Sequence, residues 1–152
     1  MVLSIEPTTS CNLRCPECLS GLRGFSRPTG MVELEMVENI MAQMGKWLVY
    51  VNLYFQGEPY LHKGMDDLVR ACKKNDVYTS TSTNAHHLTP ERSKDLVSSG
   101  LDRLIISIDG TTQETYSAYR VGGTLENVLE GTRNVLEARK SARSRTPFVV
   151  WQ

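Results

Sequence analysis

Apolar and polar residues follow two different periods along the chain. Short runs rich in β-branched and aromatic residues predict strands, whereas stretches whose apolar residues recur every three or four positions predict amphipathic helices. The strands are expected at 2–5, 48–55, 77–83, 104–110 and 148–151. The helices are expected at 34–44, 65–72, 90–100 and 125–136, with a short helical stretch around Tyr116. Strands and helices therefore alternate from one end of the chain to the other.

Capping residues mark several of the expected helix ends. Gly45 and Gly100 follow apolar stripes and are expected to end two of the helices. Thr89 precedes a proline and an acid, a pattern typical of a helix start, and Thr124 is expected to cap the last helix. Cys72 falls on the apolar face of the second helix, so it is predicted to be a core residue and not a metal ligand.

The alternation of elements predicts an α/β fold. Strands and helices of these lengths favour parallel strands joined by right-handed crossovers. Five strands with four helices would form an open, curved sheet. The segment 104–108 is nearly continuous in apolar residues, which suits a strand covered on both faces.

Length and composition describe an ordinary globular chain. Its 152 residues suffice for one core, so residues 1–152 are expected to form a single domain. The formal net charge is zero, which favours neither nucleic acid nor an anionic membrane as a partner. No apolar run approaches the ~20 residues that cross a bilayer, and no secretory signal is visible. Clustered cysteines without a disulfide framework indicate a reducing cytoplasm.

Three cysteines dominate the candidate chemistry. Cys11, Cys15 and Cys18 form a C-x3-C-x2-C pattern directly after the first expected strand. Three thiolates satisfy three irons of a cubane cluster and leave the fourth iron open to a reacting ligand. A structural zinc site usually takes four ligands in two separated pairs, and this chain has one such cluster of cysteines. An iron–sulfur site is therefore preferred, with a non-catalytic domain stabilised by zinc or iron–sulfur as the alternative.

This cysteine pattern, on a loop after a first strand, resembles the signature of the radical S-adenosylmethionine (SAM) superfamily, in the branch with SPASM or twitch extensions. The resemblance implies a partial (β/α)6 barrel, of which residues 1–152 would form the core, with C-terminal strands and any auxiliary domain absent. It also implies that Cys11, Cys15 and Cys18 hold a [4Fe-4S] cluster. Many members have an aromatic residue before the last cysteine, whereas this chain has Glu17.

Polar residues lie at the carboxyl ends of the second, third and fourth expected strands, which is where parallel α/β sheets bind ligands. Gly57, Glu58 and Pro59 resemble the family's GGEP segment, whose oxygens face the SAM ammonium; Gln56 replaces its first glycine. Asn84 follows the third strand and is expected near the ribose or methionine part of SAM.

Two further segments complete the implied SAM site. Ser107 and Asp109 resemble the fourth-strand residues that line it, and their alternation with isoleucines directs both to one side. A buried carboxylate needs a partner, so a ligand hydroxyl or a nearby cation is expected to satisfy Asp109. Arg120 matches an arginine that pairs with the methionine carboxylate. The three histidines, His62, His86 and His87, are expected in loops at the surface, without a ligand role.

The resemblance implies an enzyme that cleaves SAM reductively to methionine and a 5′-deoxyadenosyl radical, which abstracts a hydrogen atom from a substrate. An electron donor such as flavodoxin or ferredoxin would reduce the cluster. The protein would orient the cofactors and exclude water. The substrate is not implied by any residue in the chain.

Overall fold

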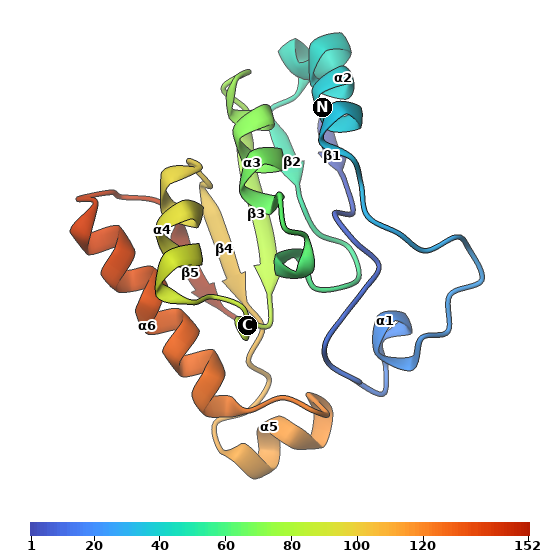
Figure 1. Cartoon of the computed structure of the whole chain (residues 1–152), viewed down its shortest axis with the longest axis vertical. Coiled ribbons are helices and arrows are strands. Elements are labelled where there is room, and N and C mark those ends of the chain that lie inside the picture. The colour runs from blue at the N-terminus through green and yellow to red at the C-terminus, as the bar shows by residue number, and fades with distance from the viewer.

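The computed structural model describes all residues, from Met1 to Gln152, and contains one five-stranded sheet. All neighbouring strands are parallel, in the order β1-β2-β3-β4-β5 (Figure 1). The strands are β1 (Val2–Ser4), β2 (Tyr50–Asn52), β3 (Tyr78–Thr83), β4 (Arg103–Ile106) and β5 (Phe148–Trp151). The predicted α/β class and the five parallel strands are therefore confirmed.

Six α-helices connect the strands, two more than the four predicted. They are α1 (Leu19–Leu22), α2 (Leu34–Met44), α3 (Met65–Lys73), α4 (Pro90–Ser98), α5 (Gln113–Tyr119) and α6 (Leu125–Ser141). Two single turns of 3-10 helix, η1 (Gly45–Trp47) and η2 (Pro59–Leu61), follow α2 and β2. The additional helices are the short α1, directly after the cysteines, and α5, which corresponds to the expected stretch around Tyr116.

Three strands end earlier than predicted: β1 by one residue, and β2 and β4 by three and four residues. After Asn52, β2 makes one more ladder bond, from Leu53 N to Ser80 O (2.8 Å), and the chain then turns into a loop. In the same way, β4 ends at Ile106, and Asp109 has a left-handed φ of 48° that a strand cannot contain. The apolar runs continue beyond these points because the loops that follow are also partly buried.

The last helix is capped differently from the prediction. Thr124 occupies the N-cap position of α6, but its side chain makes no capping hydrogen bond. Instead, Gln113 of α5 accepts a hydrogen bond from Leu125 N through Oε1 (2.8 Å), and His86 Nε2 accepts one from Thr124 N (2.9 Å). By contrast, Thr89 caps α4 as predicted, because its hydroxyl accepts a hydrogen bond from Arg92 N.

Four long helices cover one face of the sheet: α2, α3, α4 and α6 (Figure 1). Between them and the strands lies a core of 24 buried residues that includes Val51, Leu104 and Val135. Cys72 is fully buried in this core, as predicted. No helix in the structure has the length and apolar character needed to cross a bilayer.

The carboxyl ends of all five strands point to the same edge of the sheet. The cysteine loop, α1 and α5 lie beyond that edge, with α5 next to the start of α6 (Figure 1). Segments far apart in the sequence therefore meet there, and the candidate site occupies this position.

Candidate functional site

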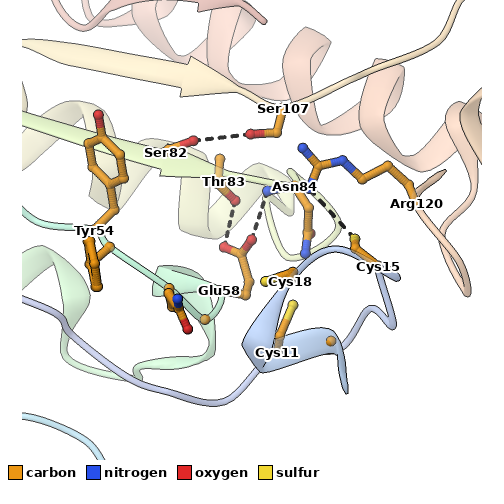
Figure 2. A pocket seen from close by; sticks show the side chains of 14 residues that line it. Cys11, Cys15, Cys18, Tyr54, Glu58, Ser82, Thr83, Asn84, Ser107 and Arg120 are labelled. Carbon is orange, nitrogen blue, oxygen red and sulfur yellow. Dashed lines mark hydrogen bonds between the residues drawn. The ribbon is translucent and has the colours of Figure 1, made fainter. Parts of the chain in front are cut away.

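A cavity at the carboxyl edge of the sheet brings most of the predicted site residues together (Figure 2). Its lining combines the cysteine loop, the loops after β2, β3 and β4, and the end of α5. The predicted residues in this lining are Cys11, Cys15, Cys18, Gly57, Glu58, Asn84, Ser107 and Arg120. Two predicted residues, Pro59 and Asp109, do not line it.

The three thiols share this cavity (Figure 2). Burial raises the pKa of Cys11 to about 11. Burial also raises the pKa of Cys15, although the positive charge of Arg120 opposes the shift. Binding a metal to these thiols must therefore release protons. In this structure no three His, Cys, Asp or Glu side chains are arranged to hold a single metal ion.

The cysteine loop is fixed by backbone contacts with its neighbours. Arg14 N donates to Val121 O (2.8 Å), which joins the loop to the segment after α5. Glycine is required at position 21, because a Cβ there would lie 2.5 Å from Cys15 O and 2.6 Å from Cys15 N. The helix α1 can therefore pack directly against the loop that carries the thiols.

The loop after β2 packs against the residues that precede Cys11. Glu58 N donates to Ser10 O (2.7 Å), and Gly57 N donates to Ser20 Oγ (2.7 Å). Gly57 has a φ of 75°, and a Cβ on it would lie 2.1 Å from Thr8 O. The carbonyl oxygens of Gln56 and Gly57, two residues that line the cavity, accept no hydrogen bond within the protein.

Glu58 is buried and connects two loops. Its carboxylate accepts hydrogen bonds from Thr83 Oγ1 (2.6 Å), Asn84 N (2.7 Å) and Tyr60 N (3.0 Å). Burial raises the pKa of Glu58, although these hydrogen bonds oppose the shift. A carboxylate has about four acceptor positions, and these hydrogen bonds occupy three of them. Pro59, the next residue, is buried as the first residue of η2 and contributes no surface to the cavity.

Asn84 has its side-chain oxygen and its amide nitrogen engaged within the protein. Its Nδ2 donates to Asn12 Oδ1 (2.8 Å), and its Oδ1 accepts a hydrogen bond from His86 N (3.1 Å). The residue therefore ties the end of β3 to the cysteine loop. Ala85, which follows it, has a left-handed φ of 64°, a conformation that favours glycine.

Ser107 and Asp109 separate at the end of β4, contrary to the expectation that both point to one side. Ser107 lies in the cavity, 3.1 Å from the hydroxyl of Ser82 on β3 (Figure 2). Asp109 instead pairs with Arg120, whose Nε donates to Oδ2 at 2.6 Å. The left-handed backbone at Asp109 breaks the alternation on which the expectation depended. Of its two expected partners, Asp109 has the nearby cation.

Arg120 extends from the end of α5 into the cavity (Figure 2). Its Nη1 lies 3.9 Å from Cys15 Sγ and donates to it. Burial alone would lower the pKa of Arg120, but the pairing with Asp109 outweighs it and raises the pKa. Arg120 is therefore a permanent positive charge beside the thiols.

Sequence reasoning missed several lining residues. Ser82, near the end of β3, is expected from the sequence only as a strand residue, but it lines the cavity next to Thr83. Tyr54 and Phe55 also line the cavity, and Phe55 is 71% exposed. The position of these residues at a strand end was the signal that could have identified them. Asn12 carried no comparable signal.

The histidines lie in loops as predicted, and all three are half-buried. His62 Nε2 lies 2.8 Å from Val32 O, which links two loops. Because His86 Nε2 accepts from Thr124 N, its Nδ1 carries the proton and donates to Asn84 O (2.9 Å). Buried loop ends need such polar partners, which explains why these side chains turn inward.

Comparison with known proteins identifies the family. The family model of the radical SAM superfamily matches residues 5–149. The chain belongs to the radical SAM superfamily. The family prediction is thus confirmed, and membership supports the predicted cofactors, a [4Fe-4S] cluster and SAM, over the zinc alternative.

Curated relatives and solved structures agree with this assignment. The GTP 3′,8-cyclase of Limosilactobacillus fermentum is 34% identical over 143 residues, which cover 90% of this chain and 42% of the cyclase. The mycofactocin maturase MftC of Mycobacterium tuberculosis is 30% identical over 137 residues, covering 90% of this chain and 34% of the maturase. The chain therefore spans less than half the length of these relatives.

The fold matches that of anSMEcpe with bound AdoMet, with a TM-score of 0.75 at 20% identity, over 99% of this chain and 42% of that one. It also matches Streptococcus suis SuiB bound to S-adenosylmethionine, with a TM-score of 0.75 at 20% identity, over 90% of this chain and 31% of that one.

The residues present fit both cofactors. A cubane cluster in this family needs three thiolates and an open side, and the cavity provides three thiols with Arg120 beside them. The free carbonyl oxygens of Gln56 and Gly57 suit an ammonium group, which has only donors. The arginine suits a carboxylate.

Proposed function

We propose that this chain is the catalytic core of a radical SAM enzyme, with the [4Fe-4S] cluster held by Cys11, Cys15 and Cys18. The observation that supports this most strongly is the convergence of three thiols, free backbone oxygens and one arginine in a single cavity of a chain from this superfamily. Residues 1–152 constitute one core domain in this proposal.

Each group in the cavity has a defined task. The three thiolates hold three irons and leave one iron open. The free oxygens of Gln56 and Gly57, with the remaining acceptor position of Glu58, bind the SAM ammonium, and Arg120 binds its carboxylate. When bound, the two cofactors supply one-electron cleavage of SAM and abstraction of a hydrogen atom from a substrate.

Ser107 and Asn84 act in different ways. Ser107 offers a hydroxyl to the ligand from the end of β4, where it already lies beside Ser82. Asn84 acts chiefly by holding the cysteine loop through Asn12, because that contact and the one with His86 use its amide nitrogen and oxygen. Pro59 contributes by starting η2 directly after Glu58, which fixes the direction of that carboxylate.

We further propose that an electron donor such as flavodoxin or ferredoxin reduces the cluster and that the protein works in the cytoplasm, where thiols remain reduced. One curated relative is a GTP 3′,8-cyclase, whereas SuiB, which shares the fold, is known bound to the precursor peptide SuiA. The cavity described above therefore serves a shared radical chemistry.

Anaerobic reconstitution with iron and sulfide tests the proposal. The wild-type chain should take up about four irons and four sulfides, and SAM should change the electron paramagnetic resonance spectrum of the reduced cluster. Alanine at Cys11, Cys15 or Cys18 should abolish cluster uptake. Cys72→Ala is the matched control, because Cys72 is buried in the core and should not affect the iron content.

Two results would contradict the proposal. One is zinc without iron or sulfide in anaerobically prepared protein, which would support a metal-stabilised domain. The other is a reduced spectrum that does not change when SAM is added.

A further inference from the structure

The guanidinium of Arg120 has two differently occupied sides. Its Nε donates to Asp109 Oδ2 at 2.6 Å, and Nη2 pairs with the same oxygen. Its Nη1 instead lies in the cavity beside Cys15. The carboxylate therefore occupies one side of the fork and leaves the other side directed at the cluster site.

Asp109 itself is outside the cavity, and its position is fixed by the backbone turn in which it lies. Its φ of 48° places it in a tight turn after β4. The next residue, Gly110, lies so close to α5 that a Cβ would be 2.4 Å from Tyr116 N. Because α5 starts with a capping box between Thr112 and Thr115 and ends at Tyr119, directly before Arg120, the turn and the helix form one packed unit.

This unit fixes the separation between the two paired groups. Asp109 precedes α5, and Arg120 follows its last residue. The ion pair therefore joins the two segments that flank the helix. Only 19% of the Arg120 side chain is exposed, whereas an unpaired arginine samples many rotamers. The carboxylate therefore selects the rotamer that places Nη1 in the cavity.

We propose that Asp109 is a positioning residue, which holds the Arg120 guanidinium beside Cys15 and does not contact SAM. This inference rests on the proposed function, since it concerns how the same cavity recognises the SAM carboxylate. It reassigns Asp109 from the ligand contact expected from the sequence to a support for the residue that makes that contact.

The ion pair can be tested in the metal-free chain, independently of any cofactor. In the wild type, the Nε–H of Arg120 should give a slowly exchanging, well-ordered nuclear magnetic resonance signal. Asp109→Asn should make this signal exchange rapidly, while Glu114→Gln, which removes an exposed carboxylate from the same helix, should not change it. An unchanged Arg120 signal in Asp109→Asn would overturn the inference, whatever the cofactor content.

The role in SAM binding is tested by a double-mutant cycle on the reconstituted protein. Asp109→Asn should weaken SAM binding about tenfold at unchanged iron content, measured by titration of the reduced cluster spectrum. In an Arg120→Ala background the same change should alter the dissociation constant by less than about twofold, because Asp109 acts through the arginine.

The other outcomes count against it. If the two substitutions changed the SAM dissociation constant by independent, multiplying factors, Asp109 would contact SAM directly. If Asp109→Asn bound SAM more tightly than the wild type, Asp109 would only compete with SAM for the guanidinium of Arg120. A wild-type chain that forms the cluster but binds no SAM would contradict the proposed function, while the resonance experiment would still report on the ion pair.

Discussion

Gly57→Ala should be the most damaging small substitution in the cavity wall. Gly57 has a φ of 75°, a conformation that costs an ordinary residue roughly 1–2 kcal/mol. The added Cβ would also lie 2.1 Å from Thr8 O and 2.9 Å from Ser10 O, and these are backbone atoms that cannot rotate away. Forcing that segment apart should cost about 1–3 kcal/mol more.

Part of this cost is offset, because alanine lowers the entropy of the unfolded chain by about 0.4–1 kcal/mol. The net loss is then about 2–4 kcal/mol, a large share of the roughly 5–15 kcal/mol that stabilises a typical domain. Gly122→Ala is the matched control. Gly122 has a φ of 86°, but a Cβ there would meet no atom within 4 Å, so only the backbone cost of about 1 kcal/mol applies.

Urea unfolding of the two metal-free variants under reducing conditions measures the difference. Gly57→Ala should unfold at a clearly lower urea concentration than Gly122→Ala, with a similar dependence on urea. Since the displaced segment leads into Cys11, cluster uptake should also decrease in Gly57→Ala alone. Equal destabilisation of the two variants would refute the argument that the close approach to Thr8 requires a glycine.

Two further predictions concern stability. Thr89→Ala and Gln113→Ala should each lower the unfolding free energy by about 1 kcal/mol, because each removes a helix cap, whereas Thr124→Ala should have little effect; equal losses for all three would contradict this. Burial raises the pKa of Asp66 to about 6 from an ordinary value of 3.8, although Arg92 opposes the shift. The fold therefore binds this proton more tightly than the unfolded chain does, so stability should fall by up to about 3 kcal/mol as the pH rises from 4 to 6. Asp66→Asn should lose this pH dependence and be more stable than the wild type at pH 7, and an unchanged pH profile would contradict the assignment.

The strands and the long helices could be predicted from the sequence, because the spacing of apolar residues within each of them is typical of its type of secondary structure. Strand ends were predicted less well, since Leu53 is buried and Ile108 half-buried in the loops that follow, and both therefore resemble strand residues. The cap of α6 could not be predicted, because Gln113 reaches it across a turn that only the folded chain defines.

In the candidate site, too, local sequence patterns predict some features, whereas others are defined only by the folded chain. The cysteine spacing, the strand-end rule and the family resemblance together predict eight residues that line the cavity. Asp109 was assigned to it because a regular strand would direct it there, and a single left-handed residue redirects it to Arg120. Gly57 is predicted from its resemblance to a segment whose oxygens face the SAM ammonium, whereas the structure requires glycine there because a Cβ would lie 2.1 Å from Thr8 O.

The cysteine loop is anchored to three other parts of the fold, through Arg14 to Val121, Asn12 to Asn84 and Ser10 to Glu58. Its conformational entropy is thus lost when the chain folds, before any metal arrives. In a zinc finger, by contrast, metal binding supplies the free energy of folding. Chelation should therefore leave the secondary structure and cooperative unfolding of this protein intact, because its site is preorganised by the protein itself.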